Sequence, residues 1–112
     1  MTDHFSYTVA AEFTDASIRD EWVAWLRDGH LADVFRGGAI RAEVIVEDVP
    51  EGQPPRAEVR YHFASRETFA TYEREHAPRL RAEGLERFPP ARGIRYARRT
   101  GHVVHRAAGE SF

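Results

Sequence analysis

The sequence of 112 residues predicts an α+β fold in the order strand, helix, strand, strand, helix, strand. One observation is a stripe of apolar residues at helical spacing between Asp15 and Gly38, which lies between two segments that alternate apolar and polar residues. The other is a weaker version of the same arrangement later in the chain. Together they indicate two helices lying across one face of a four-stranded antiparallel sheet.

The first strand is predicted over residues 5–13, because apolar side chains occupy every second position there. The following helix begins near Asp15, whose carboxylate can accept hydrogen bonds from the free amides of the first turn. Gly29 interrupts this helix, so His30 lies either at its end or at the start of a short second piece. The inward stripe consists of Trp22, Trp25, Leu26, His30, Leu31 and Val34.

Two further strands are predicted over residues 40–47 and 57–64, and the polar, proline-rich loop between them makes them a hairpin. Ser65 caps the second helix, whose inward positions are Phe69, Tyr72, His76 and Leu80. Pro78 kinks or splits this helix, because proline disfavours helical geometry in the residue before it. A last strand runs over about 92–104.

This order of elements is that of the ferredoxin-like βαββαβ fold. We expect one domain over residues 1–112, with an ordered core of about 5–104 and a loose C-terminal tail. The aromatic residues of the strands belong on the helix side, since that face must be dry. A mixed set belongs on the opposite, open face: Thr8, Glu12, Arg41, Glu43, Glu58, Arg60, His62, Arg95 and Arg99.

The composition excludes several kinds of chemistry. The chain has no cysteine, lysine or asparagine, so a Schiff-base lysine, a nucleophilic cysteine, a thiolate metal site and a lysine phosphate loop are impossible. The preference for arginine and alanine indicates a high-GC bacterial source. We expect no membrane partner and a cytoplasmic location, because no apolar run approaches a bilayer span and no signal-peptide pattern opens the chain.

Two runs of residues form a recognisable pattern: Trp22, Trp25, His30 and Leu31 in the first helix, and Glu75, Ala77, Pro78, Leu80, Arg81, Ala82, Glu83, Arg87 and Phe88 in the second. With them the chain resembles a bacterial family known only as a domain of unknown function. The resemblance covers about residues 5–104 and implies the fold of the dimeric α/β barrels, related to antibiotic-biosynthesis monooxygenases and ethyl-tert-butyl-ether-degradation proteins. It implies no reaction.

The candidate ligand-binding residues are Tyr7, Trp25, His30, Tyr61 and Tyr96. The three tyrosines come from neighbouring strands and share the helix-facing parity, so they form either a hydrogen-bonded core or a pocket in which a ligand supplies the partner. We expect core for Tyr7 and pocket for Tyr61 and Tyr96. His30 either bonds the last carbonyls of its helix or serves with Tyr61 as an acid/base pair.

We expect no metal site and no cofactor. Asp28, His30 and Asp33 surround the helix break, and His102 and His105 point to opposite sides of a strand, so neither set converges. Haem chemistry in relatives of this fold would be expected to use an asparagine, which the chain lacks.

We also expect no nucleic-acid partner, although the last strand is rich in arginine. Aromatic residues such as Phe5 and Phe63 share the parity of core residues, so exposing them to stack bases would expose the core. The formal net charge of −2 also gives no overall attraction to a polyanion.

Three functions stay open. The first is a homodimeric protein that binds a small apolar or aromatic molecule between helices and sheet. The second is a cofactor-independent monooxygenase or isomerase that uses His30 and a tyrosine. The third is a structural or interaction module without a ligand. In each case we expect a homodimer formed through the open sheet face, whose interleaved small and charged side chains can pair across an interface.

Overall fold

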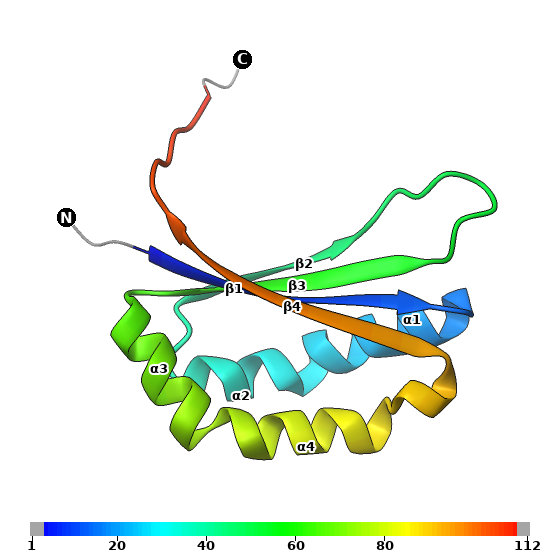
Figure 1. Ribbon diagram of the computed structural model, residues 1–112, viewed down its shortest axis with the longest axis horizontal. Coiled ribbons are helices and arrows are strands. Elements are labelled where there is room, and N and C mark those ends of the chain that lie inside the picture. The colour runs from blue at the N-terminus through cyan, green and yellow to red at the C-terminus, as the bar shows by residue number, and fades with distance from the viewer. Residues whose placement is uncertain (1–3, 110–112) are drawn as a thin grey trace.

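The computed structural model describes residues 4–109. Its four strands form one antiparallel sheet in the order β2-β3-β1-β4, and all helices lie on one side of it, as Figure 1 shows. The strands are β1 (His4–Phe13), β2 (Arg41–Val46), β3 (Arg56–Phe63) and β4 (Ile94–Val103). The predicted ferredoxin-like α+β fold is confirmed.

The two central strands, β1 and β3, bring their aromatic residues into one row. Tyr7 of β1 lies opposite Tyr61 of β3, and Phe5 lies opposite Phe63. On the other side of β1, Ala11 faces Tyr96 of β4. The side chains of Phe5, Tyr7, Tyr61 and Phe63 are buried beneath the helices, as their parity predicted.

The first helical segment consists of α1 (Ala16–Trp25), the π-helical turn η1 (Leu26–His30) and α2 (Leu31–Arg36). The Asp15 carboxylate accepts the Ser17 backbone N–H at 2.8 Å and caps α1. Gly29 interrupts the helical segment as predicted, because its φ of 178° is not helical and the segment is kinked there. His30 lies at the start of the second piece and leads directly into α2.

The second helical segment is split at His76 into α3 (Arg66–Glu75) and α4 (Ala77–Arg87). Ser65 caps α3 in a reciprocal arrangement with Thr68. Pro78 lies in the first turn of α4, where its missing N–H leaves no hydrogen bond unmade. The predicted break is confirmed, and its position allows α4 to run under the sheet.

The last strand begins two residues later than predicted, because residues 90–92 form the 3-10 turn η2 (Pro90–Arg92). Residues 104–109 are exposed and have no regular structure, and the rest of the predicted loose tail lies outside the described residues. The ends of the predicted domain, residues 1–3 and 110–112, lie outside them as well.

Two residues of the open face of the sheet are less exposed to solvent than its polar composition predicted. Thr8 and His62 belong to this face, yet they are only 2% and 7% exposed. Thr8 lies in register between Arg60 and Arg99 on the two neighbouring strands, whose long side chains flank it. The Nε2 atom of His62 lies 2.9 Å from a carboxylate oxygen of Glu43. Long charged side chains thus cover the short residues beneath them.

Candidate ligand cavity

A cavity of about 60 Å³ lies between the helices and the sheet, and we call it the inner cavity. The strands supply tyrosine rings to it, the α1 and η1 segment supplies Trp25 and His30, and α4 supplies Leu80 and Arg81. All five residues proposed from the sequence therefore line one space: Tyr7, Trp25, His30, Tyr61 and Tyr96.

Two phenols of the inner cavity have no partner. Tyr61 and Tyr72 are only 2% and 4% exposed. Within residues 4–109 the tyrosine hydroxyls that form hydrogen bonds belong to Tyr7 and Tyr96, which leaves those of Tyr61 and Tyr72 unpaired. Burial raises the pKa of both unpaired phenols well above the usual range, so both are protonated at neutral pH. Neither hydroxyl oxygen is fully enclosed, since the fully buried unpaired side-chain atoms within residues 4–109 are the Nδ1 atoms of His4 and His62. The two tyrosine hydroxyls can therefore be reached by water or by a ligand.

The other two tyrosines are bonded to the protein. The Tyr7 oxygen accepts a hydrogen bond from the Arg81 guanidinium at 3.4 Å. The Tyr96 hydroxyl donates to the backbone carbonyl of Phe88 at 2.8 Å, and burial raises the pKa of Tyr96 to about 12. Tyr96 thus offers the cavity its ring and ties β4 to the end of α4, which differs from the expectation that its hydroxyl is free for a ligand.

His30 stacks on Trp25, with ring centroids 4.1 Å apart and planes inclined by 22°. Its imidazole makes no hydrogen bond to a helix carbonyl or to any other group in the described part of the chain. Burial lowers the pKa of His30 and outweighs the opposite effects of Asp33 and Glu83. The ring is therefore neutral at pH 7 and free to accept or donate a proton.

A second hollow lies on the outer side of the same two rings. This outer groove of about 490 Å³ runs between α1 and α4, and it shares Trp25 and His30 with the inner cavity. The stacked pair thus forms a wall between the two spaces. The polar residues of the outer groove are mostly acidic: Glu21, Asp28, Asp33 and Glu83, with Arg87 and His30.

Tyr72, Arg81 and Arg98 also line the inner cavity and were not proposed from the sequence as site residues. The sequence could have identified Tyr72 as a site residue, because it occupies an inward position of the predicted second helix. No sequence pattern identifies Arg81 or Arg98 as site residues. An arginine on a helix or on an edge strand usually indicates a solvated face, and only the packing of α4 against β1 and β4 brings these two to the cavity.

Residues 4–109 contain no cluster of three or more His, Asp or Glu side chains that could hold a metal ion. Within the same residues no helix is long and apolar enough to cross a membrane. The aromatic rings of β1 and β3 face the helices and are buried, so they are not accessible for stacking on nucleic-acid bases.

Residues 5–92 match the family model described as a domain of unknown function, DUF4286. The chain belongs to the DUF4286 family. This confirms the family of unknown function that the sequence resembled. No curated protein matches this DUF4286 sequence.

Solved structures with a similar fold include proteins of the kinds that the resemblance implied. A dimeric ferredoxin-like protein from an uncultured marine organism is 13% identical, with a TM-score of 0.68 over 96% of this chain and 100% of the other. A Bacillus cereus protein named after antibiotic biosynthesis monooxygenases is 14% identical, with a TM-score of 0.64 over 97% and 100%. An ethyl tert-butyl ether degradation family protein from Bacillus halodurans is 10% identical, with a TM-score of 0.57 over 84% and 95%. At these identities the likeness shows the fold.

Proposed function

We propose that this protein binds a small apolar or aromatic molecule in the inner cavity. The observation that carries the proposal is that the buried residues Tyr61 and Tyr72 both line the cavity and that their hydroxyls have no hydrogen-bond partner in the described residues. A filled core would leave these groups unsatisfied at a cost of about 1–3 kcal/mol each. A ligand, or water that a ligand displaces, supplies what they lack.

The size of the inner cavity limits what it holds. A dry cavity of roughly 150 Å³ accepts a benzene ring, whereas the inner cavity measures about 60 Å³. The ligand therefore has a narrow apolar end, or the half-buried ring of Trp25 moves when a wider one enters. The exposed side chain of Leu85 at the rim leaves room for the rest of the molecule.

Phenol is a suitable first probe, and its binding is measured by NMR chemical-shift perturbation. Leu85→Trp narrows the rim and is expected to weaken binding at least about tenfold, equivalent to about 1.4 kcal/mol. Phe35→Trp adds a similar ring to an exposed position of α2 away from the cavity and is expected to leave binding unchanged. Equal binding to both variants would contradict the proposed site, and no binding to any form would favour the interaction module without a ligand.

A second candidate function is catalysis without a cofactor by His30 and Tyr61, as a monooxygenase or an isomerase. The two residues line the same cavity, and burial keeps the imidazole neutral and the phenol protonated, which suits a base and an acid. For a bound compound with an acidic C–H, His30→Gln is expected to abolish deuterium exchange in D₂O while binding persists. Exchange at the wild-type rate in His30→Gln would contradict this role.

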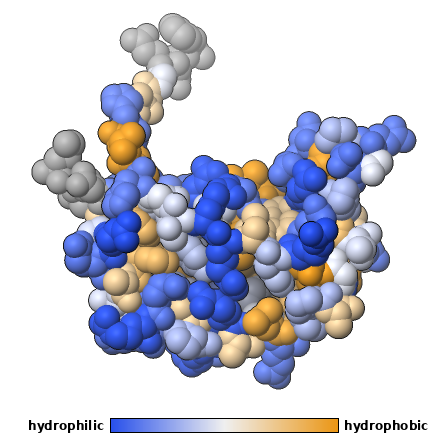
Figure 2. All heavy atoms as spheres, viewed as in Figure 1, coloured by the Kyte–Doolittle hydropathy of each residue, from blue (hydrophilic) through white to orange (hydrophobic). Residues whose placement is uncertain are grey.

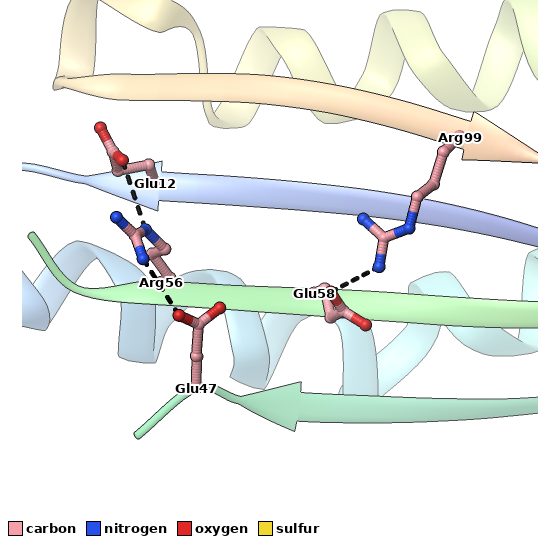
Figure 3. A network of polar contacts seen from close by, with 5 residues as sticks. All are labelled: Glu12, Glu47, Arg56, Glu58 and Arg99. Carbon is pink, nitrogen blue, oxygen red and sulfur yellow. Dashed lines mark hydrogen bonds and ion pairs between the residues drawn. The ribbon is translucent and has the colours of Figure 1, made fainter. Parts of the chain in front are cut away.

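We further propose that the protein is a homodimer joined through the open face of the sheet. In Figure 3 the charged side chains of this face already pair within the chain: Arg56 bonds Glu12 and Glu47, and Arg99 bonds Glu58. A neutralised face costs less to bury than one with unpaired charges. A sheet face of this size can supply the roughly 800 Å² per partner of a standard interface.

The side of the molecule that Figure 2 shows offers no continuous apolar surface as an alternative, because hydrophobic residues occur there in scattered spots among hydrophilic ones. Light scattering that shows a monomer at micromolar concentration would contradict the homodimer.

We also propose that the protein is located in the cytoplasm of a bacterium. The proposal rests on the composition rich in arginine and alanine and on the lack of an apolar run of bilayer length. Fractionation of the source cells tests it.

A further inference from the structure

The charged residues that line the inner cavity and the outer groove have opposite signs. The residues lining the inner cavity include two arginines, Arg81 and Arg98, and no aspartate or glutamate. The four carboxylates that line the outer groove are each paired with an arginine outside its lining, so their charge is largely neutralised. A negatively charged ligand is therefore attracted to the inner cavity, where no carboxylate in the lining offsets the arginines.

Arg81 prepares the phenol of Tyr7 to donate a hydrogen bond. One nitrogen of its guanidinium lies 3.4 Å from the Tyr7 oxygen and 2.9 Å from a carboxylate oxygen of Glu73. Because the Tyr7 oxygen accepts from Arg81, the hydroxyl hydrogen of Tyr7 is free to be donated elsewhere. Together with the hydroxyls of Tyr61 and Tyr72, this gives the cavity three O–H donors and no acidic acceptor.

Arg98 is the unpaired charge at the inner cavity. The neighbouring Arg99 bonds Glu58 on the open face, and Arg95 lies 4.0 Å from Glu12 on that same face. Arg98 lies between them in sequence but on the helix-facing side of β4, opposite Val9, and it forms no ion pair with any residue from 4 to 109. Its charge acts on Tyr72 and Tyr96, favouring their ionised forms against the larger effect of burial.

We propose that the ligand of the inner cavity is a small planar carboxylate, whose anionic end is held by the exposed Arg98 and by the hydroxyl of Tyr7 and whose apolar end enters among the aromatic rings. This proposal rests on the binding function proposed above. A guanidinium and a carboxylate match as paired donors and acceptors, and a charged hydrogen bond is stronger than a neutral one. Arg81, already neutralised by Glu73, positions Tyr7 and takes a smaller share of the charge.

Two pairs of probes separate charge from shape. Benzoate and benzamide have the same outline, and crotonate and crotonamide form a slimmer pair suited to a narrow cavity. Isothermal titration calorimetry on the full chain is expected to give at least about tenfold tighter binding for the acid of whichever pair fits. Raising the salt concentration is expected to weaken the acid and not the amide.

The matched variants are Arg98→Gln and Arg95→Gln, which make the same change on opposite faces of β4. Arg98→Gln is expected to bring the acid down to the affinity of its amide, while Arg95→Gln leaves the difference intact. Both arginines are exposed, so both variants are expected to fold, and circular dichroism checks this.

The outcomes distinguish the two proposals. Equal binding of acid and amide, or an equal loss in both variants, would overturn the carboxylate proposal and leave the small-molecule site standing. Failure of all four probes at millimolar concentration would overturn both. Acid binding that is lost in Arg95→Gln alone would place the anion on the open face and overturn the assignment to the inner cavity.

Discussion

The indole of Trp25 and the imidazole of His30 stack at a centroid distance of 4.1 Å and form the wall between the inner cavity and the outer groove. The wall rests on Gly84 of α4, where a Cβ atom would lie 3.2 Å from the Cη2 atom of the indole. A glycine thus allows α4 to approach closely enough to support the ring. The stack adds to the burial that lowers the pKa of His30, and it separates two spaces whose charged lining residues have opposite signs.

Removing the ring of Trp25 is expected to join the two spaces. In Trp25→Ala the free energy of unfolding is expected to fall by about 2 kcal/mol, less than for a fully buried ring, because Trp25 is half-buried. The pKa of His30, now solvated, is expected to rise toward its ordinary value. Urea unfolding and an NMR titration measure the two effects, and Phe35→Ala is the control. An unchanged pKa of His30 would show that the indole does not shield it.

Replacing each tyrosine with phenylalanine is expected to separate bonded phenols from free ones. Tyr96→Phe leaves the Phe88 carbonyl without its donor and is expected to cost about 1–2 kcal/mol of stability. Tyr61→Phe and Tyr72→Phe remove unpaired hydroxyls and are expected to leave stability unchanged or slightly higher. Thermal unfolding of the three variants measures this. Equal destabilisation in all three would mean that the cavity phenols are bonded in the folded protein.

Protonation of His30 is expected to make stability depend on pH. Its pKa is lowered in the folded protein, so between that value and the ordinary 6.5 the unfolded chain binds more protons. The contribution of neutral His30 to the free energy of unfolding is therefore complete above pH 6.5. It decreases as the pH falls below 6.5 and stays constant below the pKa of His30 in the folded protein. The chain has six histidines, so the measurement is the difference between wild type and His30→Gln across this window. Parallel pH profiles of the two proteins would contradict the lowered pKa.

A methyl group at Gly37 is expected to overlap with the ring of Tyr72, which lines the inner cavity. Its Cβ would lie 2.8 Å from the Cδ1 atom of Tyr72 and 3.1 Å from the Cγ atom of His76. Gly37→Ala is expected to lower the free energy of unfolding by about 2 kcal/mol, through this overlap alone, since the φ angle of −82° suits alanine. Gly29→Ala, whose Cβ would meet nothing within 4 Å, is the control. Urea unfolding of both variants decides, and equal effects would contradict the overlap.

A charge placed in the middle of the open face is expected to dissociate the homodimer. Ala10 of β1 lies in register with Ala97 of β4 on that face. Ala10→Arg is expected to shift the molar mass in light scattering from dimer to monomer, because an unpaired buried charge is costly. Ala70→Arg, at an exposed position of α3, is the control. A dimer that survives Ala10→Arg and not Ala70→Arg would place the interface on the helices.

The candidate site was partly predictable. The alternation in β1 and β3 indicated that Tyr7 and Tyr61 face the helices, and the helical stripe indicated that Trp25 and His30 face the sheet. Two such faces must meet, so their residues line a shared space. The contribution of Arg98 was hidden, because in a run such as Arg98–Arg99 the same residue type points to the cavity and to the open face in turn.

The sequence by itself determined the order of the elements, their faces and the breaks near Gly29 and Pro78, because these depend on local periodicity and on backbone chemistry within a few residues. The tertiary structure alone decided which buried groups are satisfied. Tyr96 meets the Phe88 carbonyl only because β4 returns across the end of α4. Tyr61 instead lines a void, left where the aromatic rings do not fill the space between the helices and the sheet. Hydrogen-bond partners and voids depend on atomic positions from several elements at once, and no spacing along one of them encodes these.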